Sequence, residues 1–400
     1  MNSTRNTLSG RTLLGKGLWF SAIILALCTS TVLAACENHD NPAEQDSATT
    51  IANQVWDFSQ THPDGFTLDI RTMTEPSQGI AVSYAETQNS HSRSALDWVV
   101  SHALAHDGFV GGWLNPENGL YYFDSTKLFP ETALKDALLF GKENGQQSLF
   151  ILSTYTSIPT TGKVAEIVER GTLLVGTTGD YRPLSFCEPD STYWGFGIEM
   201  ARAIANELGV KTTFVHTSWP TLTADVLAEP QLFDLAIGSI TITDARRETM
   251  LMSEGYLANG KTILCRATES DRYKTLADID QPEVVVMGNP GGLNEKFAKE
   301  NLTHATITVH QKNEEIPTLI AEGKADVMIT EITEAPYYVQ TDSRLAAPLL
   351  NEPFTRGQIG VLMQKGQDDL LQMVNNTIRK MKADGTLQRL HEKYGQVYAY

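Results

Sequence analysis

Short apolar segments of strand length alternate with segments of helical length from about residue 163 onward, in two successive series. Such alternation is typical of α/β units in which helices cover a sheet. In the first series we expect strands at 172–177, 211–216 and 233–240 and helices at 199–208 and 221–228. In the second we expect strands at 283–288, 305–309 and 325–330 and helices at 294–301 and 314–322. The pattern predicts two α/β lobes, followed by helices that break at Gly385, a residue type that commonly ends helices.

A smaller unit is expected before these lobes, over residues 51–153. Its strand-like segments lie at 66–71, 79–84, 109–114, 120–124 and 148–152, and its helix-like segments at 92–105 and 131–144. Residues 115–119, Asn-Pro-Glu-Asn-Gly, have strong turn chemistry and predict a hairpin between their flanking strands. Residues 154–162 are rich in Ser and Thr, contain Pro159 and lack an apolar period, so we expect a linker there. This unit reads as a small α+β domain of unassigned role.

The N-terminal residues read as a leader. Residues 1–16 are polar and basic, residues 18–33 form an apolar run, and small residues follow, which is typical of a signal peptide over 1–35. The sequence Leu33-Ala34-Ala35-Cys36 resembles the bacterial lipoprotein processing box, so lipidation of Cys36 and a tether over 36–50 are expected. An ordinary cleavage site with an incidental cysteine, or an uncleaved signal anchor, is the alternative. The expected location is the cell envelope, on its extracytoplasmic, periplasmic side, with membrane attachment through the lipid.

Charge and motif content exclude several functional classes. The formal net charge is −17, and the leader contributes only cations, so the rest of the chain is still more acidic. Nucleic-acid binding is therefore not expected, because it needs clustered Lys and Arg. Four cysteines are too few for a disulfide scaffold, and no phosphate or dinucleotide loop occurs, so no cofactor is expected. His102 and His106 have a metal-compatible spacing but lack a third ligand, so we expect exposed or capping histidines and no metal site.

Several short motifs occur in an order that resembles a known family. They are 176–184, 195–201, 241–246, 323–326 and 382–387. Over about residues 163–396 the chain resembles extracytoplasmic solute-binding proteins of the amino-acid class. The resemblance implies an α/β, two-lobed, periplasmic-binding-protein-like fold of type 2, preceded by the small α+β domain. Lobe 1 would span about 163–264 and 357–400, and lobe 2 about 265–356.

Within that superfamily the chain resembles the periplasmic cyclohexadienyl dehydratases. The matching stretches are 177–181, 217–222, 256–262 and, most specifically, 289–297. This branch converts prephenate to phenylpyruvate and arogenate to phenylalanine, so the resemblance implies an envelope-anchored carbon–oxygen lyase. The main alternative is a non-catalytic amino-acid-binding lipoprotein that serves an ABC permease or a sensor. A third is an interaction lipoprotein whose binding domain is vestigial, and a homo-oligomer is compatible with all three.

The expected ligand site lies between the lobes, where loops follow the carboxyl ends of strands. Arg246 can hold a carboxylate bidentately, with the hydroxyls of Thr241 and Thr243 beside it. Tyr181 and Trp219 would supply flat walls for a cyclohexadienyl ring. Without the resemblance, the arginine could be a solvated surface charge and the aromatic side chains could belong to a core.

The resemblance assigns Glu295 the role of general acid, because a carboxyl group in a closed cleft can have its pKa raised enough to donate a proton. The alternative is an acid that merely favours the first turn of a helix. Asn294, Lys261 and Arg182 are expected to orient the substrate or neutralise its second carboxylate. Glu331 falls where amino-acid-binding relatives usually have an Asp that meets the ligand ammonium.

Two further positions depart from this pattern. Leu293 stands where the dehydratase loop commonly has Thr, and Gly197 replaces the usual Asp of a Gly-Phe-Asp motif. These departures weaken the assignment of the family's function to this chain more than the assignment of its fold. Cys187 and Cys265 could pair in an oxidising compartment, but sequence alone does not give their separation.

Overall fold

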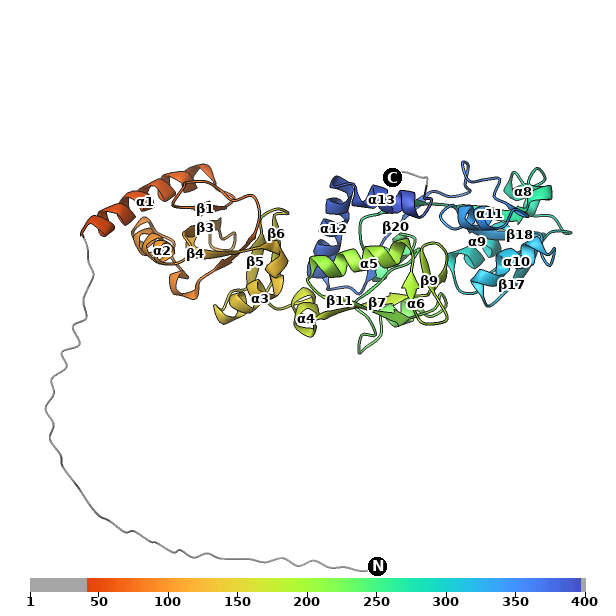
Figure 1. Ribbon diagram of the computed structural model, residues 1–400, viewed down its shortest axis with the longest axis horizontal. Helices are drawn as coiled ribbons and strands as arrows, with labels where there is room; N and C mark the ends of the chain where they lie inside the picture. Colours follow the sequence, from red (N-terminus) through yellow and green to blue (C-terminus); the bar gives the residue numbers. More distant parts are fainter. Residues whose placement is uncertain (1–41, 397–400) are drawn as a thin grey trace, which may run out of the picture. The chain divides into compact units, whose positions relative to one another are not determined.

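The structure, a computed structural model, describes residues 42–396 (Figure 1). The leader and Cys36 lie outside the described residues. Helix α1 (Pro42–Thr61) begins within the segment that we expected to be a tether, so the tether prediction is wrong from residue 42 onward. The reason is packing, because Ala48, Ala52 and Val55 are buried on one face of this helix. No helix in the described part of the chain is long and apolar enough to span a membrane.

An antiparallel sheet of six strands, in the order β1-β3-β4-β2-β5-β6, follows α1. Its strands are β1 (Phe66–Asp69), β2 (Ile80–Ser83), β3 (Phe109–Leu114), β4 (Tyr121–Phe129), β5 (Ser148–Ile151) and β6 (Thr156–Pro159). Helices α2 (Arg93–Ala105) and α3 (Leu134–Glu143) and the 3-10 turns η1 (Ala85–Thr87) and η2 (Glu131–Ala133) lie between them. Strands β3 and β4 form the predicted hairpin, in which Trp113 lies opposite Tyr122. The α+β character of this unit is confirmed.

Strand β6 occupies the segment that we expected to be a linker, so that prediction is wrong. It pairs with β5, and Ile158 lies opposite Leu149 with its side chain fully buried. Thr156 also points inward, where its hydroxyl accepts a hydrogen bond of 2.6 Å from the Asn376 amide. Side chains of a strand are buried alternately, and β6 shows this pattern over its four residues. A pattern of four residues among polar neighbours was too short to identify the strand from the sequence.

Lobe 1 contains a five-stranded mixed sheet in the order β11-β7-β12-β21-β13. Its strands are β7 (Thr172–Thr177), β11 (Lys211–His216), β12 (Leu235–Ala236), β13 (Leu251–Met252) and β21 (Leu362–Met363). A separate three-stranded sheet comprises β8 (Asp180–Tyr181), β9 (Ser185–Cys187) and β10 (Tyr193–Trp194). The helices are α4 (Lys163–Arg170), α5 (Phe196–Glu207), α6 (Leu222–Val226), α7 (Asp244–Thr249), α12 (Asp368–Ala383) and α13 (Thr386–Lys393).

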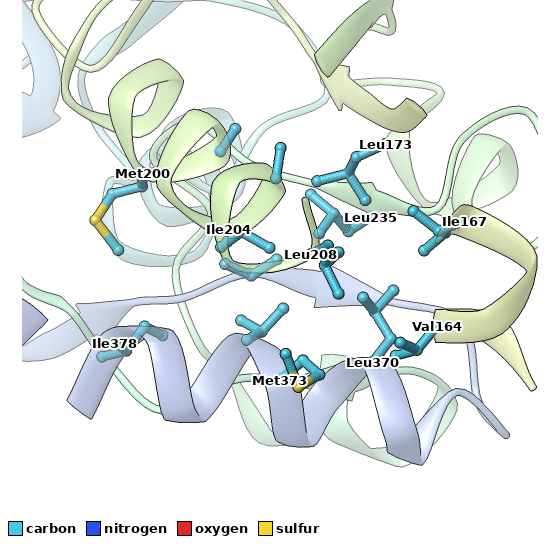
Figure 2. Close-up of a cluster of buried hydrophobic side chains, with 14 of the residues drawn as sticks. Val164, Ile167, Leu173, Met200, Ile204, Leu208, Leu235, Leu370, Met373 and Ile378 are labelled. Atoms are coloured by element: carbon cyan, nitrogen blue, oxygen red, sulfur yellow. The ribbon is translucent and has the colours of Figure 1, made fainter. Parts of the chain in front are cut away.

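The core of lobe 1 lies between the sheet and its helices. Figure 2 shows side chains of α5, including Ile204, facing side chains of α12, including Leu370, with Val164 of α4 beside them. These three side chains are fully buried. The predicted break at Gly385 is confirmed, since this residue has a φ of 75°, in the left-handed region that favours glycine, and lies between α12 and α13.

Lobe 2 contains a second mixed sheet in the order β17-β16-β18-β15-β19. Its strands are β15 (Lys261–Arg266), β16 (Val285–Gly288), β17 (Thr306–Val309), β18 (Val327–Glu331) and β19 (Leu345–Ala346). The helical segments are η3 (Ala267–Glu269), α8 (Leu276–Ile279), α9 (Leu293–Asn301), η4 (Asn313–Glu315), α10 (Ile316–Ala321) and α11 (Ala335–Thr341). Cys265 is buried in this lobe, whereas Cys187 lies in lobe 1, and both are free thiols.

Two short strands connect the lobes. They are β14 (Leu257–Asn259) and β20 (Gly357–Ile359), which pair antiparallel to each other. Because β15 begins at Lys261 and pairs with β18, the chain enters lobe 2 near residue 260 and not at 265 as we expected. The difference matters for the site, since it moves Lys261 from lobe 1 to lobe 2.

Candidate functional site

A cavity of about 280 Å³ is lined by residues of both lobes. Lobe 1 contributes Tyr181, Trp219, Ser239, Thr241 and Arg246. Lobe 2 contributes Lys261, Asn289, Gly292, Leu293, Asn294 and Glu331. The cavity therefore brings together seven of the ten predicted ligand and catalytic residues and leaves out Thr243, Arg182 and Glu295.

Glu331 and Lys261 form the polar centre of this cavity. They lie opposite each other in the paired strands β18 and β15, which fixes their side chains together at one end of the lobe 2 sheet. Lys261 Nζ lies 2.7 Å from Glu331 Oε1 and donates a second hydrogen bond, of 2.6 Å, to Asn294 Oδ1. Both charged side chains are more than nine-tenths buried. A buried pair of this kind is stable only when further hydrogen bonds satisfy it.

Hydroxyl groups of lobe 1 supply those bonds to Glu331. Tyr181 Oη and Ser239 Oγ donate to Oε2 at 2.8 and 3.2 Å, and Thr241 Oγ1 donates to Oε1 at 3.3 Å. Burial by itself would raise the pKa of Glu331, but the Lys261 charge and the hydrogen bonds hold that pKa below its ordinary value. Glu331 is therefore ionised, and its carboxylate joins the two lobes across the cavity.

Aromatic side chains form the adjoining wall. Tyr181 and Trp219 meet edge to face, with ring centroids 5.7 Å apart and an interplanar angle of 70°. The Trp219 indole N–H donates to Asp180 Oδ1 at 3.2 Å, which fixes the orientation of the ring. Burial raises the pKa of Asp180. The wall combines flat apolar surface with positioned polar groups.

Arg246 reaches the cavity from helix α7. Its Nη1 donates to the Thr241 carbonyl oxygen at 2.6 Å, and among the described residues it forms no salt bridge. Burial lowers the pKa of this arginine, and the charge of Glu331 opposes that effect. A guanidinium that lacks a carboxylate partner in a half-buried position is suited to bind a carboxylate of a ligand.

Thr243 is not among the residues that line the cavity. Its hydroxyl accepts a hydrogen bond of 3.3 Å from the Arg246 backbone N–H, which makes Thr243 the N-cap of α7. The side chain of Arg182 is also outside the cavity lining, because its guanidinium stacks on Phe186 at 3.4 Å from the ring centroid. Each side chain is engaged by a neighbour within its own lobe.

Glu295 differs most from its expected role. It accepts hydrogen bonds from the Gly291 backbone N–H at 2.7 Å and from Lys299 Nζ at 2.5 Å. Lys299 and that backbone hydrogen bond lower the pKa of Glu295, whereas a general acid needs a raised one. The neighbouring Asn294 lines the cavity, and successive residues on a helix project in directions about 100° apart. Glu295 occupies the first turn of α9, as the alternative reading expected.

Sequence reasoning missed Glu334, a fully buried carboxyl group that hydrogen-bonds to Tyr181 of the cavity lining. Asn313 Nδ2 donates to Glu334 Oε1 at 2.7 Å, and Thr330 Oγ1 donates to Oε2 at 2.5 Å. Burial is the largest influence and raises the pKa of Glu334 to about 8, in spite of hydrogen bonds from Thr330, Asn313 and Tyr181. Glu334 is therefore mostly protonated at neutral pH. Glu334 follows Glu331 by three residues, and this spacing was the one signal in the sequence that could have identified it as a site residue.

Asn289 and Ser239 were also missed as cavity residues. The Asn289 side chain is buried, and its Oδ1 has no hydrogen-bond partner in the described part of the chain. An unsatisfied buried amide oxygen in a cavity wall is costly unless a ligand or water completes it. The site therefore has both charged and neutral polar groups to orient a ligand.

Several known proteins are similar to part of this chain. A cyclohexadienyl dehydratase of Pseudomonas aeruginosa is 39% identical over 205 residues, which cover 51% of this chain and 76% of that protein. The L-cystine-binding protein TcyJ of Escherichia coli K12 is 30% identical over 234 residues, covering 58% of this chain and 86% of TcyJ.

A crystal structure of AncCDT-1, an ancestral amino-acid-binding protein described as a precursor of cyclohexadienyl dehydratase, is also similar. It shares 36% identity with a TM-score of 0.54 and covers 58% of this chain and 99% of its own. The two-lobed fold of type 2 is thereby confirmed. Residues 173–397 match the bacterial extracellular solute-binding proteins, family 3, and the chain belongs to this family.

Proposed function

We propose that this protein is a cyclohexadienyl dehydratase, which converts prephenate to phenylpyruvate, arogenate to phenylalanine, or both. The observation that carries the proposal is the cavity, where Arg246, Lys261 and Glu331 lie beside an aromatic wall. The identity to a named dehydratase, 39%, supports it. Membership of an extracellular family implies an extracytoplasmic location. Attachment to the membrane through Cys36 is part of the proposal.

The first task of such a site is to hold a small acid with two carboxylates. Arg246 has the free guanidinium that suits one carboxylate, with Thr241 adjacent. The amide N–H groups of Asn289 and Asn294 in the cavity wall suit a second. The Trp219 and Tyr181 rings would pack against the cyclohexadiene. Buried cations bind anions strongly because water does not compete with them.

The second task is to protonate the departing hydroxyl group. When the ring carboxylate leaves as carbon dioxide, its bonding electron pair moves into the ring, and the 4-hydroxyl leaves with a proton as water. We propose that Glu334, which holds the proton, supplies it through Tyr181 and the Glu331 carboxylate, and that Glu295 has no part in this step. Glu334 holds a proton at neutral pH, and Glu331 faces the ligand space. Tyr181 lies between the two carboxyl groups. It donates a hydrogen bond to Glu331, and its hydrogen bond with Glu334 lowers the pKa of that residue.

Turnover of prephenate by the chain from residue 37 onward tests the proposal, with phenylpyruvate absorbance as the readout. Glu334→Gln and Glu331→Gln should each reduce kcat by roughly 10²- to 10⁴-fold, the usual contribution of general acid catalysis. Glu295→Gln is the matched control, because its side chain faces Lys299 and should not affect turnover. If the unaltered protein turns over neither prephenate nor arogenate yet binds an ordinary amino acid tightly, the enzyme proposal is wrong.

The second candidate function is capture of an amino acid for an ABC transporter. The observation that favours it is the ionised Glu331, because a carboxylate in this position suits an ammonium group. The similarity to an L-cystine-binding protein points the same way. Tight amino-acid binding with no chemical change in the ligand would support this function.

A further inference from the structure

The hydrogen bonds around Glu331 affect which ligands this cavity can bind. Four groups donate to its two oxygens: Tyr181, Ser239, Thr241 and Lys261. An ionised carboxylate offers about four lone-pair positions. Each oxygen of Glu331 therefore already accepts two hydrogen bonds, and its capacity as an acceptor is used by the protein itself.

A ligand ammonium could donate one hydrogen bond to Asn289 Oδ1, but its counter-charge would have to be a carboxylate. Among the described residues that line the cavity, Glu331 is the only carboxylate. To bind it, an ammonium would have to displace a hydroxyl donor or Lys261. Displacing Lys261 would leave a side chain that is 7% exposed without its counter-charge.

Sharing the carboxylate is also unfavourable. Lys261 Nζ lies 2.7 Å from Glu331 Oε1, so an ammonium on that oxygen would be a close neighbour of the lysine ammonium. Two like charges repel strongly where water is excluded. The second hydrogen bond from Lys261, to Asn294, restrains the lysine from moving away.

A ligand keto oxygen is easier to bind in this cavity than a ligand ammonium. It only accepts hydrogen bonds, so it needs donors and not acceptors. Lys261 has three N–H donors, and Glu331 and Asn294 use two of them. One donor remains for a ligand acceptor. The Arg246 guanidinium donates one hydrogen bond to the Thr241 carbonyl and has further N–H groups for the adjoining carboxylate.

We propose that this cavity selects α-keto acids over the corresponding α-amino acids, with Lys261 as the residue that determines the choice. The inference rests on the proposed function and narrows it, since prephenate is the keto acid and arogenate the amino acid of the substrate pair. Lys261 determines specificity in two ways: its positive charge repels a ligand ammonium, and its remaining N–H group can donate to a ligand keto oxygen.

Calorimetric affinities for phenylpyruvate and L-phenylalanine test the proposal without any turnover, because the two share a skeleton and differ at the α-substituent. We expect the chain from residue 37 onward to bind phenylpyruvate at least tenfold more tightly at pH 7. Lys261→Met, which keeps length and removes charge, should shift the ratio of affinities at least tenfold toward L-phenylalanine. Lys296→Met is the control on exposed surface and should leave the ratio unchanged.

Lys261→Arg serves if the methionine variant does not fold, because it retains the charge and should retain the preference for the keto acid. Equal or tighter binding of L-phenylalanine by the unaltered protein, or binding of neither compound, overturns the inference. An unchanged ratio in Lys261→Met also overturns it. Failure of the proposed function gives a different result from failure of this inference. In that case the protein would still prefer keto acids in the binding assay but would not turn over prephenate. Efficient turnover of arogenate with preferred binding of amino acids would support the enzyme and refute the selectivity.

Discussion

Replacement of Glu334 by Gln should change how stability depends on pH. The carboxyl group is fully buried, and burial raises its pKa from an ordinary 4.5 to about 8. Between these two values the folded chain holds a proton that the unfolded chain has released. The stabilisation is therefore fully present below pH 4.5 and is lost as the pH rises through 8. Gln is neutral at every pH and can occupy the same volume.

The magnitude follows from the two pKa values. With 4.5 for the unfolded chain and about 8 for the folded chain, proton linkage gives Glu334 about 4 kcal/mol at pH 5 and less than about 1 kcal/mol at pH 8. The variant should therefore gain roughly 3–4 kcal/mol in unfolding free energy relative to the unaltered protein between these pH values. Other titrating groups are common to both proteins and cancel in the difference.

Urea unfolding, followed by tryptophan fluorescence at pH 5, 6, 7 and 8, measures these free energies by linear extrapolation. Glu322→Gln is the control, because this glutamate is exposed on the same lobe, and its difference from the unaltered protein should not vary with pH. A Glu334→Gln difference that changes by less than about 1 kcal/mol over this range would refute the reasoning. It would mean that Glu334 is ionised in the folded chain and does not hold a proton.

Three further predictions concern other parts of the chain. Arg246→Ala should weaken binding of phenylpyruvate at least a hundredfold in calorimetry, because a buried anion would lose its partner; unchanged affinity would place Arg246 outside the site. Leu370→Ala should lower the unfolding free energy by roughly 2–5 kcal/mol in urea, since this fully buried side chain would leave a cavity; a smaller loss would show that the core collapses around it. Cys36→Ser should abolish labelling by palmitate and release the protein from membranes, and equal labelling would contradict lipidation.

Local sequence patterns were sufficient for much of the fold. Apolar periodicity located most strands and helices of both lobes, because one face of each element is buried against its neighbours. Turn chemistry at 115–119 located the β3–β4 hairpin, since hydrogen bonds within the turn itself define it. Arg246, Lys261 and Trp219 were placed in the candidate site from short motifs, and the structure brings all three to one cavity.

Tertiary structure decided which polar side chains face that cavity. Asn294 and Glu295 are adjacent in sequence, but the orientation of α9 turns Asn294 into the cavity and leaves Glu295 with Lys299. Glu334 reads as an ordinary helix-terminal acid, and its raised pKa exists only because distant segments, including Asn313, exclude water from it. Desolvation and hydrogen bonding of a buried group depend on elements far apart in the chain. Sequence spacing does not specify their packing, so it could not distinguish the carboxyl group that holds a proton from the one that does not.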